Sequence, residues 1–167
     1  MLKVITNPAE IRYSAIMEIY SESNRISASL NIRHTTLNEA LFDVENQFYH
    51  YLTQDFLSAE GAFLAVWEDA GQWVSALRIV PYLDGLLLAG LETHPGHRGK
   101  GFASALVQYV LQFLGSNGPI YSHVKKQNIP SLKIHEKYGF HIIQNYSIYI
   151  DGSVDDDCFT LCCKPLG

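Results

Sequence analysis

The chain has 167 residues, of which 47% are hydrophobic and 17% are charged, a composition that excludes a disordered or collagen-like protein. Its 12 Lys and Arg residues against 17 Asp and Glu residues give a net charge of −5, which disfavours nucleic acid as a main partner. No apolar run reaches the roughly 18 residues of a membrane span, and no secretory signal opens the chain, so we expect no membrane partner.

The first half of the chain carries helical and strand-like hydrophobic patterns in turn. Asn7 before a proline, and Thr36 three residues before Glu39, are typical starts of helices. A polar connection, residues 24–34, separates the two helices. The expected elements are a strand at 2–6, helices at 7–23 and 37–56, and strands at 62–67, 72–81 and 86–93.

The second half predicts a long helix, a strand, a short helix and two more strands. Glycines after the two helices, Gly115 and Gly139, mark their ends. The expected elements are helices at 102–114 and after Asn128, and strands at 120–124, 140–150 and 158–164, the last two joined by 151–157. This order predicts an α+β or mixed α/β domain, with one mixed sheet of about six to seven strands and about four helices.

A glycine-rich turn, residues 94–104, lies between a predicted strand and the long predicted helix. Backbone N–H groups at the start of a helix point toward one site, where the helix dipole also favours negative charge. Arg98 and Lys100 lie in the turn and can add charge-assisted hydrogen bonds. The sequence therefore predicts a site for a phosphate-bearing cofactor.

Two common nucleotide-binding patterns fit this turn poorly. A Walker A motif needs Ser or Thr where Gly101 stands, and a dinucleotide motif needs a glycine in place of Ser104. A third pattern, Arg/Gln-x-x-Gly-x-Gly/Ala, is matched at every fixed position, by Arg98, Gly101 and Ala103. On these residues the chain resembles the GNAT superfamily of N-acetyltransferases, in which such a turn holds the pyrophosphate of acetyl-CoA.

A second segment carries the same resemblance. Asn128, Ser131 and a Gly-Phe pair at 139–140 follow the family's other cofactor-binding segment, with His135 where the family usually has tyrosine. The order of elements matches the family over essentially the whole chain. The resemblance implies one domain, 1–167, that transfers acetyl from acetyl-CoA, without a metal, to a primary amine of a small molecule, amino acid or peptide.

The resemblance also implies where the cofactor lies. The strand before the turn would splay from the strand after the long helix, and the pantetheine arm would lie in that wedge. The implied cofactor-binding residues are Leu91, Thr93, Arg98, Gly99, Lys100, Gly101, Phe102, Ala103, Ser104, Asn128, Ser131 and His135. Asn128 also suits the N-cap of the short helix, and the two roles are compatible.

Acetyl transfer from a thioester to an amine needs a base for the amine proton and a proton for the leaving thiolate. Glu92, at the end of the strand before the turn, is the candidate base, with His123 as a second candidate. His135 stands at the position of the family's usual general acid, and Tyr138, three residues further on, is the alternative. Because His135 departs from the pattern, a CoA-binding module with weak or no catalysis stays open as a second function.

Three cysteines, Cys158, Cys162 and Cys163, cluster near the C-terminus without the spacing of a disulfide framework. They indicate reduced thiols and a cytoplasmic location. The sequence does not identify the acceptor amine. A homodimer through the C-terminal strands is compatible with it, but no pattern requires one.

Overall fold

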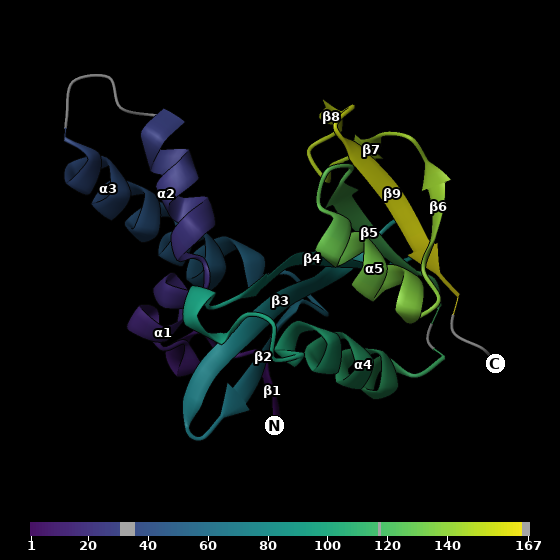
Figure 1. The fold of residues 1–167 in the computed structure, drawn as a ribbon, viewed down its shortest axis with the longest axis horizontal. Helices are drawn as coiled ribbons and strands as arrows, with labels where there is room; N and C mark the ends of the chain where they lie inside the picture. Colours follow the sequence, from purple (N-terminus) through teal and green to yellow (C-terminus); the bar gives the residue numbers. More distant parts are fainter. Residues whose placement is uncertain (31–35, 117, 165–167) are drawn as a thin grey trace.

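The computed structural model describes residues 1–30, 36–116 and 118–164, and its framework is one sheet of seven strands (Figure 1). The strand order is β1-β2-β3-β4-β5-β9-β6, and all neighbours are antiparallel except β4 and β5. Its strands are β1 (Leu2–Ile5), β2 (Phe63–Asp69), β3 (Gln72–Tyr82), β4 (Gly85–Thr93), β5 (Ile120–Lys125), β6 (His141–Gln144) and β9 (Cys158–Cys163). A separate pair, β7 (Ser147–Ile148) and β8 (Val154–Asp155), completes the described strands.

Helices cover both faces of this sheet. They are α1 (Tyr13–Ile19), α2 (Ser21–Leu30), α3 (Leu37–His50), α4 (Phe102–Leu114) and α5 (Ile129–Lys137), with shorter turns η1 (Pro8–Glu10), η2 (Tyr51–Phe56) and η3 (Pro95–His97). One core cluster joins α1 and η2 to β2 and β3, and the other joins α4 to the opposite face. The predicted α+β architecture is confirmed. Among the described helices none is both long and apolar enough to cross a bilayer.

The helical region at the N-terminus differs from its prediction. Asn7 caps only the short turn η1, because Ile11 is extended and buried, and α1 starts at Tyr13. The predicted polar connection is wrong over residues 24–30, which continue α2; residues 31–35 lie outside the described part. Asn24 and Ala28 explain the helix, since these residues, four apart, are the two buried residues of α2. Tertiary burial thus overrides local composition.

Two predicted C-terminal strands are also shorter than expected. The prediction of one strand over 140–150 is wrong, because the chain bends after β6 and re-pairs as β7. Pairing of β6 with β9 is already irregular at its end, where the register shifts between Ile142 and Gln144. The predicted connection, residues 151–157, contains the two-residue strand β8.

The parallel strands β4 and β5 pair over only part of their length. Three consecutive pairs, from Leu86 with Ile120 to Leu88 with Ser122, join them, although β4 continues to Thr93 and β5 to Lys125. On its other side β4 has a bulge opposite β3, where Gly90 adopts a φ of 60°. The splay implied by the sequence resemblance is therefore present. We call the space between residues 89–93 of β4 and 123–125 of β5 the wedge.

Candidate active site

The turn after β4 has the backbone geometry of an anion site. Gly99 and Gly101 have φ values of 74° and 83°, which favour glycine for conformational reasons, since a Cβ at either position would meet nothing within 4 Å. Gly101 is the N-cap of α4 and supplies no side-chain hydrogen bond. The first N–H groups of α4 are thus left without a side-chain cap and can bind an anionic group.

Arg98, the first residue of the turn motif, points to α2. Its two terminal nitrogens donate to both carboxylate oxygens of Glu22 at 2.9 and 2.7 Å, and its Nε donates to the carbonyl of Thr93 at 3.4 Å. The hydrogen bonds raise the pKa of Arg98 and lower the pKa of Glu22. Lys100 is exposed. The sequence alone does not single out Glu22, because its bond to Arg98 joins residues 76 positions apart.

Glu92 lies on the same side of the sheet as α2. Its carboxylate accepts a hydrogen bond from Ser23 Oγ at 2.6 Å. Burial raises the pKa of Glu92, and this effect exceeds the opposing effects of Ser23, Arg78 and Arg98. A carboxylate with a raised pKa, held by one hydroxyl, is suited to accept a proton near neutral pH.

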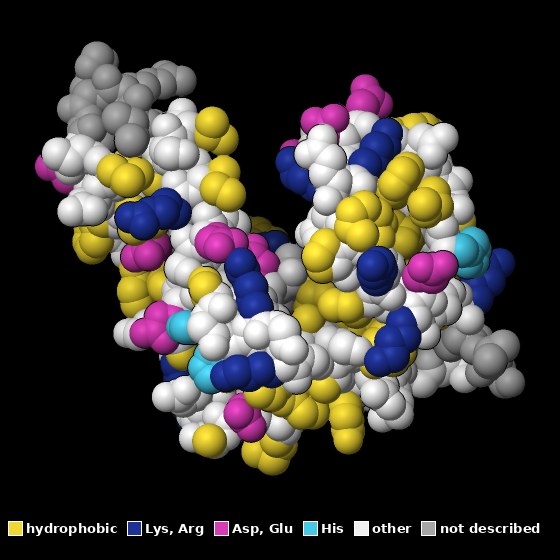
Figure 2. Space-filling view, viewed as in Figure 1, with side chains coloured by type: hydrophobic (Ala, Val, Ile, Leu, Met, Phe, Trp, Pro, Cys, Tyr) yellow, Lys and Arg dark blue, Asp and Glu magenta, His cyan; other side chains and the backbone are white. Residues whose placement is uncertain are grey.

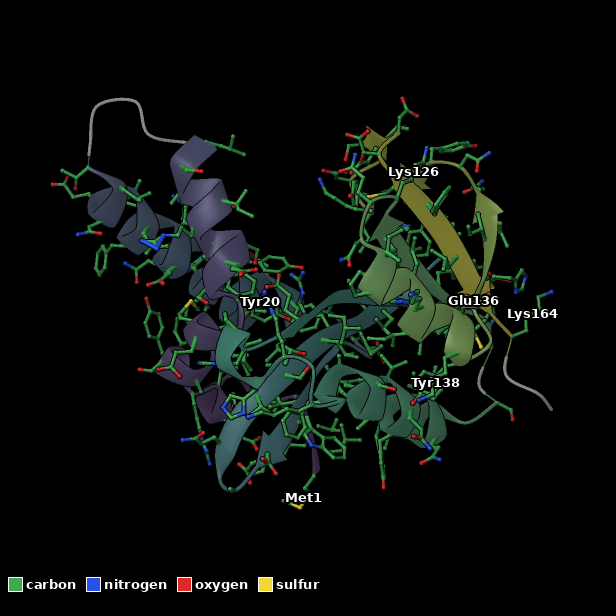
Figure 3. The ribbon with its side chains drawn as sticks, viewed as in Figure 1. Met1, Tyr20, Lys126, Glu136, Tyr138 and Lys164 are labelled. Atoms are coloured by element: carbon green, nitrogen blue, oxygen red, sulfur yellow. The ribbon has the colours of Figure 1, made fainter. Side chains whose placement is uncertain are left out.

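Residues around Glu92 fix the end of β4. The backbone carbonyl of Glu92 accepts from Ser75 Oγ at 2.7 Å, and the carbonyl of Gly90 in the bulge accepts from Tyr20 Oη at 2.6 Å. Tyr20 lies at the junction of α1 and α2, where Figure 3 labels it. The bulge therefore has hydrogen-bonded support from both β3 and the helices.

His123, the second candidate base, lies on β5 between two tyrosines. Its ring is 5.4 Å from that of Tyr82 and 5.3 Å from that of Tyr149, both edge-on. Neither ring nitrogen has a hydrogen-bond partner among the described residues, and burial lowers the pKa of His123. Among the described residues, no hydrogen bond or ion pair links His123 to Glu92.

The second predicted cofactor segment forms α5. The side chain of Asn128 accepts from the backbone N–H of Ser131 at 3.2 Å, which confirms the predicted N-cap. Gly139 follows the helix with a φ of 84°, as its predicted position requires. The local structure of this segment is therefore the one read from its sequence.

His135 is buried, with 1% of its surface exposed. Its Nδ1 lies 2.8 Å from the carbonyl oxygen of Ser131, which only accepts, so Nδ1 carries the proton. Its Nε2 is buried without a partner among the described residues, and the ring packs edge-on against Phe140 at 5.0 Å. Burial lowers the pKa of His135, so the imidazole is neutral and its Nε2 has no proton to donate.

Tyr138 lies between α5 and α4 (Figure 3). Its hydroxyl is 2.8 Å from Ser104 Oγ and donates to Gln108 Oε1 at 3.4 Å, while Lys137 Nζ donates to Ser104 Oγ at 3.1 Å. The structure thus brings Tyr138 to the first turn of α4. The two candidate acids, His135 and Tyr138, face different surroundings.

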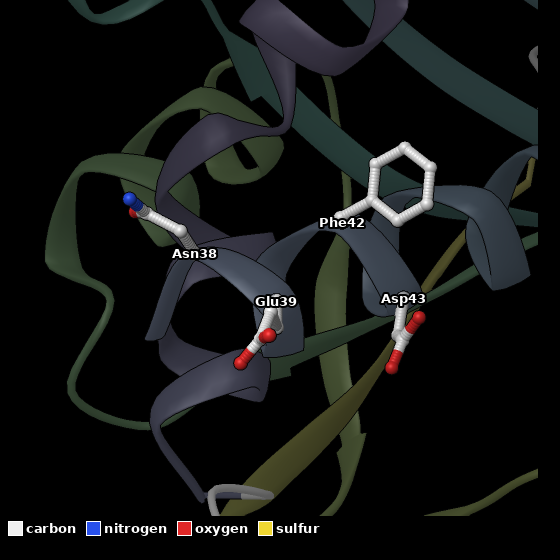
Figure 4. Close-up of a pocket in the computed structure, with 4 residues that line it drawn as sticks. All are labelled: Asn38, Glu39, Phe42 and Asp43. Carbon is white, nitrogen blue, oxygen red and sulfur yellow. The ribbon is translucent and has the colours of Figure 1, made fainter. Parts of the chain in front are cut away.

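Two surface hollows contain none of the candidate catalytic residues. One, of ≈ 470 Å³, is lined by Asn38, Glu39, Phe42 and Asp43 on a single helix, α3 (Figure 4). Glu39 there is already used in the capping box of Thr36. The other, of ≈ 440 Å³, is lined by Arg12, Ser14, Ala15, Glu18, Gly71, Gln72, Trp73, His94 and His97.

Neither hollow is lined by Glu92, Gly99 or Gly101. Figure 2 also shows an open cleft between the part of the surface that holds α2 and α3 and the part that holds β7, β8 and β9. In the described part of the chain no group of three His, Cys, Asp or Glu side chains is placed to hold a metal ion. His94 Nδ1, for example, accepts from the N–H of Gly96.

Comparison with known proteins agrees with this geometry. A family model described as the acetyltransferase (GNAT) family matches residues 15–140. A search of curated protein sequences finds no match.

Solved structures resemble the chain over nearly its whole length. A PaiA N-acetyltransferase from Thermoplasma acidophilum in complex with coenzyme A has 11% identity and a TM-score of 0.66, with 98% of this chain and 99% of that one covered. An aminoglycoside 6'-acetyltransferase type Ii has 13% identity, a TM-score of 0.68 and coverage of 100% and 98%. YncA, a putative acetyltransferase from Salmonella typhimurium with acetyl-CoA, has 17% identity, a TM-score of 0.62 and coverage of 100% and 94%.

Proposed function

The chain belongs to the acetyltransferase (GNAT) family, whose members use acetyl-CoA, and on that premise we propose that it acetylates a primary amine of a small molecule, amino acid or peptide. The observation that carries the proposal is the wedge, which has the glycine turn at its open end and Glu92 on its β4 side. This arrangement supports a proposal in which Glu92 acts as base and the start of α4 binds an anionic group of a ligand in the wedge.

Two features of the chain fit the cofactor. The N–H groups at the start of α4, after Gly101, would bind the pyrophosphate. The unpaired edge of β4 around Leu91 and Thr93 would hydrogen-bond the pantetheine arm as a strand does. When bound, acetyl-CoA supplies the thioester whose acetyl group is transferred.

Glu92 is the proposed base. An alkyl ammonium has a pKa of about 10 and must lose a proton before its nitrogen attacks. Glu92 takes that proton, directly or through water, and the neutral nitrogen then attacks the thioester carbonyl. As the C–N bond forms and the C–S bond breaks, the thiolate leaves with the bonding electron pair and gains the second proton, which the nitrogen releases. His123 is the weaker candidate base, since its ring is enclosed by two tyrosines.

The proposal is tested by the release of free thiol from acetyl-CoA in the presence of a panel of primary amines. We expect thiol release that requires both acetyl-CoA and an amine, with an acetylated amine as the second product. Binding of acetyl-CoA by calorimetry without thiol release from any amine would instead identify the CoA-binding module. That second function is favoured by one observation, the buried His135 without a proton on Nε2.

Replacing His135 with Leu is expected to change kcat by less than about twofold. The imidazole donates only within its own helix, so its removal deprives the thiolate of no proton. A side chain of similar volume keeps the change in unfolding free energy below about 1.5 kcal/mol. A loss of kcat above tenfold with unchanged KM would establish His135 as the general acid. Tyr138→Phe, assayed in parallel, tests the alternative acid.

Replacing Arg98 with Ala is expected to weaken acetyl-CoA binding, and the loss should shrink as salt is added. Two contributions act together: a positive charge near the phosphates is lost, and the turn loses its link to Glu22. Glu22→Gln separates them, because it breaks the ion pair but keeps the charge of Arg98. Calorimetric affinities that are equal for the wild type and Arg98→Ala would contradict the phosphate role.

A further inference from the structure

Arg78 on β3 is a half-buried cation that forms no ion pair within the described residues. It forms no salt bridge with any described residue, whereas Lys3, Arg12 and Arg98 each lie beside a carboxylate. Its Nε is shielded from solvent and has no acceptor in the described part of the chain. Removing a guanidinium from water without a counter-ion is costly, and an anionic ligand would offset that cost.

The surroundings hold the Arg78 guanidinium in place. It lies over the rings of Phe48 and Tyr51, 5.7 and 5.5 Å from their centroids. It also lies close to Gly90, where a Cβ would come within 2.5 Å of an Arg78 nitrogen. The bulge glycine therefore leaves room for the guanidinium, and a planar fork fixed in this way is suited to bind a carboxylate through two parallel hydrogen bonds.

Arg78 and Glu92 belong to the same side of the same part of the sheet. Glu92 on β4 pairs with Ala76 on β3, and the side chains of paired residues lie on the same face. Arg78 is two residues beyond Ala76 on β3, so its side chain is on that face too, about 7 Å further along the strand. The charge of Arg78 acts on Glu92, opposing the rise of its pKa. One small molecule can therefore meet both side chains.

We propose that the acceptor is an amine that also carries a carboxylate, such as an amino acid, with Arg78 binding the carboxylate and Glu92 facing the amine. This inference rests on the proposed acetyltransferase function. Charge balance favours a carboxylate over a phosphate, because Arg78 offsets a single negative charge. A phosphate dianion would leave excess negative charge beside Glu92.

The test compares matched acceptors that differ only in the anionic group: amino acids, their carboxamides, the decarboxylated amines and aminoalkyl phosphates. For the wild type we expect kcat/KM to be about 10- to 100-fold higher for the amino acid than for its carboxamide or decarboxylated amine, the range of a charge-assisted hydrogen bond. In Arg78→Gln this ratio should fall to near one, mainly through KM for the amino acid. Arg78→Lys, which keeps the charge but not the fork, should give an intermediate ratio.

Arg12→Gln is the matched control, since Arg12 also lies over an aromatic ring, that of Trp73, but contacts neither Gly90 nor Glu92. In Arg12→Gln the ratio of kcat/KM for the amino acid to that for its carboxamide should equal the wild-type ratio. Equal wild-type rates on carboxylate and carboxamide acceptors overturn the inference without any variant, and so does a preference for the aminoalkyl phosphate. Absence of thiol release with every amine would instead overturn the acetyltransferase function itself.

Discussion

Replacing Glu92 with Gln is expected to lower kcat by about 10²- to 10⁴-fold, the usual contribution of a positioned general base. Glutamine still offers an oxygen to Ser23 Oγ, so the local hydrogen bond is kept and the loss reports the missing proton acceptor. In the wild type, kcat should fall on the acid side below a pKa that burial has raised above the usual carboxyl range. In the variant this fall of kcat at acid pH should be absent. Its kcat should recover partly at high pH, where more of the amine is already neutral.

The measurement is the pH dependence of kcat and of kcat/KM for both proteins. Glu10→Gln, a change at an exposed carboxylate in η1, is the control and should leave both profiles unchanged. A rate loss in Glu92→Gln that is constant across pH would assign Glu92 to binding the acceptor. His123→Gln would then be the next variant to assay for the base.

The Glu92→Gln variant should also be more stable than the wild type at neutral pH. Because folding raises the pKa of Glu92, the folded state binds the proton more tightly than the unfolded chain does. The stability from this group is present below the unfolded pKa of about 4.3 and is lost as pH rises through the folded pKa. The Tm of Glu92→Gln should therefore exceed that of the wild type at pH 7.5 and lose this advantage near pH 4. A lower Tm for the variant at pH 7.5 would contradict the burial of this carboxylate.

Replacing Gly85 with Ala is expected to destabilise the fold by about 3 kcal/mol, at the upper end of the usual cost of overpacking. A Cβ at Gly85 would lie 2.0 Å from the carbonyl oxygen of Pro119, and that oxygen also accepts from the N–H of Leu86 at 3.1 Å. The obstructing atom is a backbone oxygen, so it cannot move without disturbing the paired segment of β4 and β5 that closes the wedge. For a chain of this size the change corresponds to a fall in Tm of about 6–12 °C.

Thermal unfolding with and without acetyl-CoA measures this effect. Gly96→Ala is the matched control, because its Cβ would meet only the ring of His94, at 3.3 Å, and a ring can rotate away. An unchanged Tm for Gly85→Ala would mean that β4 and β5 can separate at their closed end without cost.

The helices that bracket the cofactor segments could be predicted from the sequence because their ends are marked locally. α4 runs from Phe102 to Leu114 as expected, with glycines of positive φ on both sides, and α5 lies between a side-chain cap and Gly139. Such signals depend on residues within a few positions, and the sequence alone carries them. The glycine turn and the N-cap at Asn128 can be predicted for the same reason, because each depends on residues within a few positions.

The acceptor side of the site could not be predicted in this way. α2 buries Asn24 and Ala28 and packs against α3, and the bond of Arg98 to Glu22 joins residues 76 positions apart. The stacking of Arg78 on aromatic rings likewise depends on how α3 and η2 lie against β3. The sequence could name Glu92 from its place before the turn, but not the burial that raises its pKa.

β4 and β5 pair at only three positions, so beyond Ser122 no hydrogen bonds join the described strands β1–β4 to strands β5, β9 and β6. An extended ligand along residues 89–93 would take the place of the missing strand partner there, as the proposed function requires. By mass action, a ligand at 100 times its Kd adds about 2.7 kcal/mol to the free energy of unfolding. If the proposed cosubstrate binds here, the Tm should rise with the concentration of acetyl-CoA.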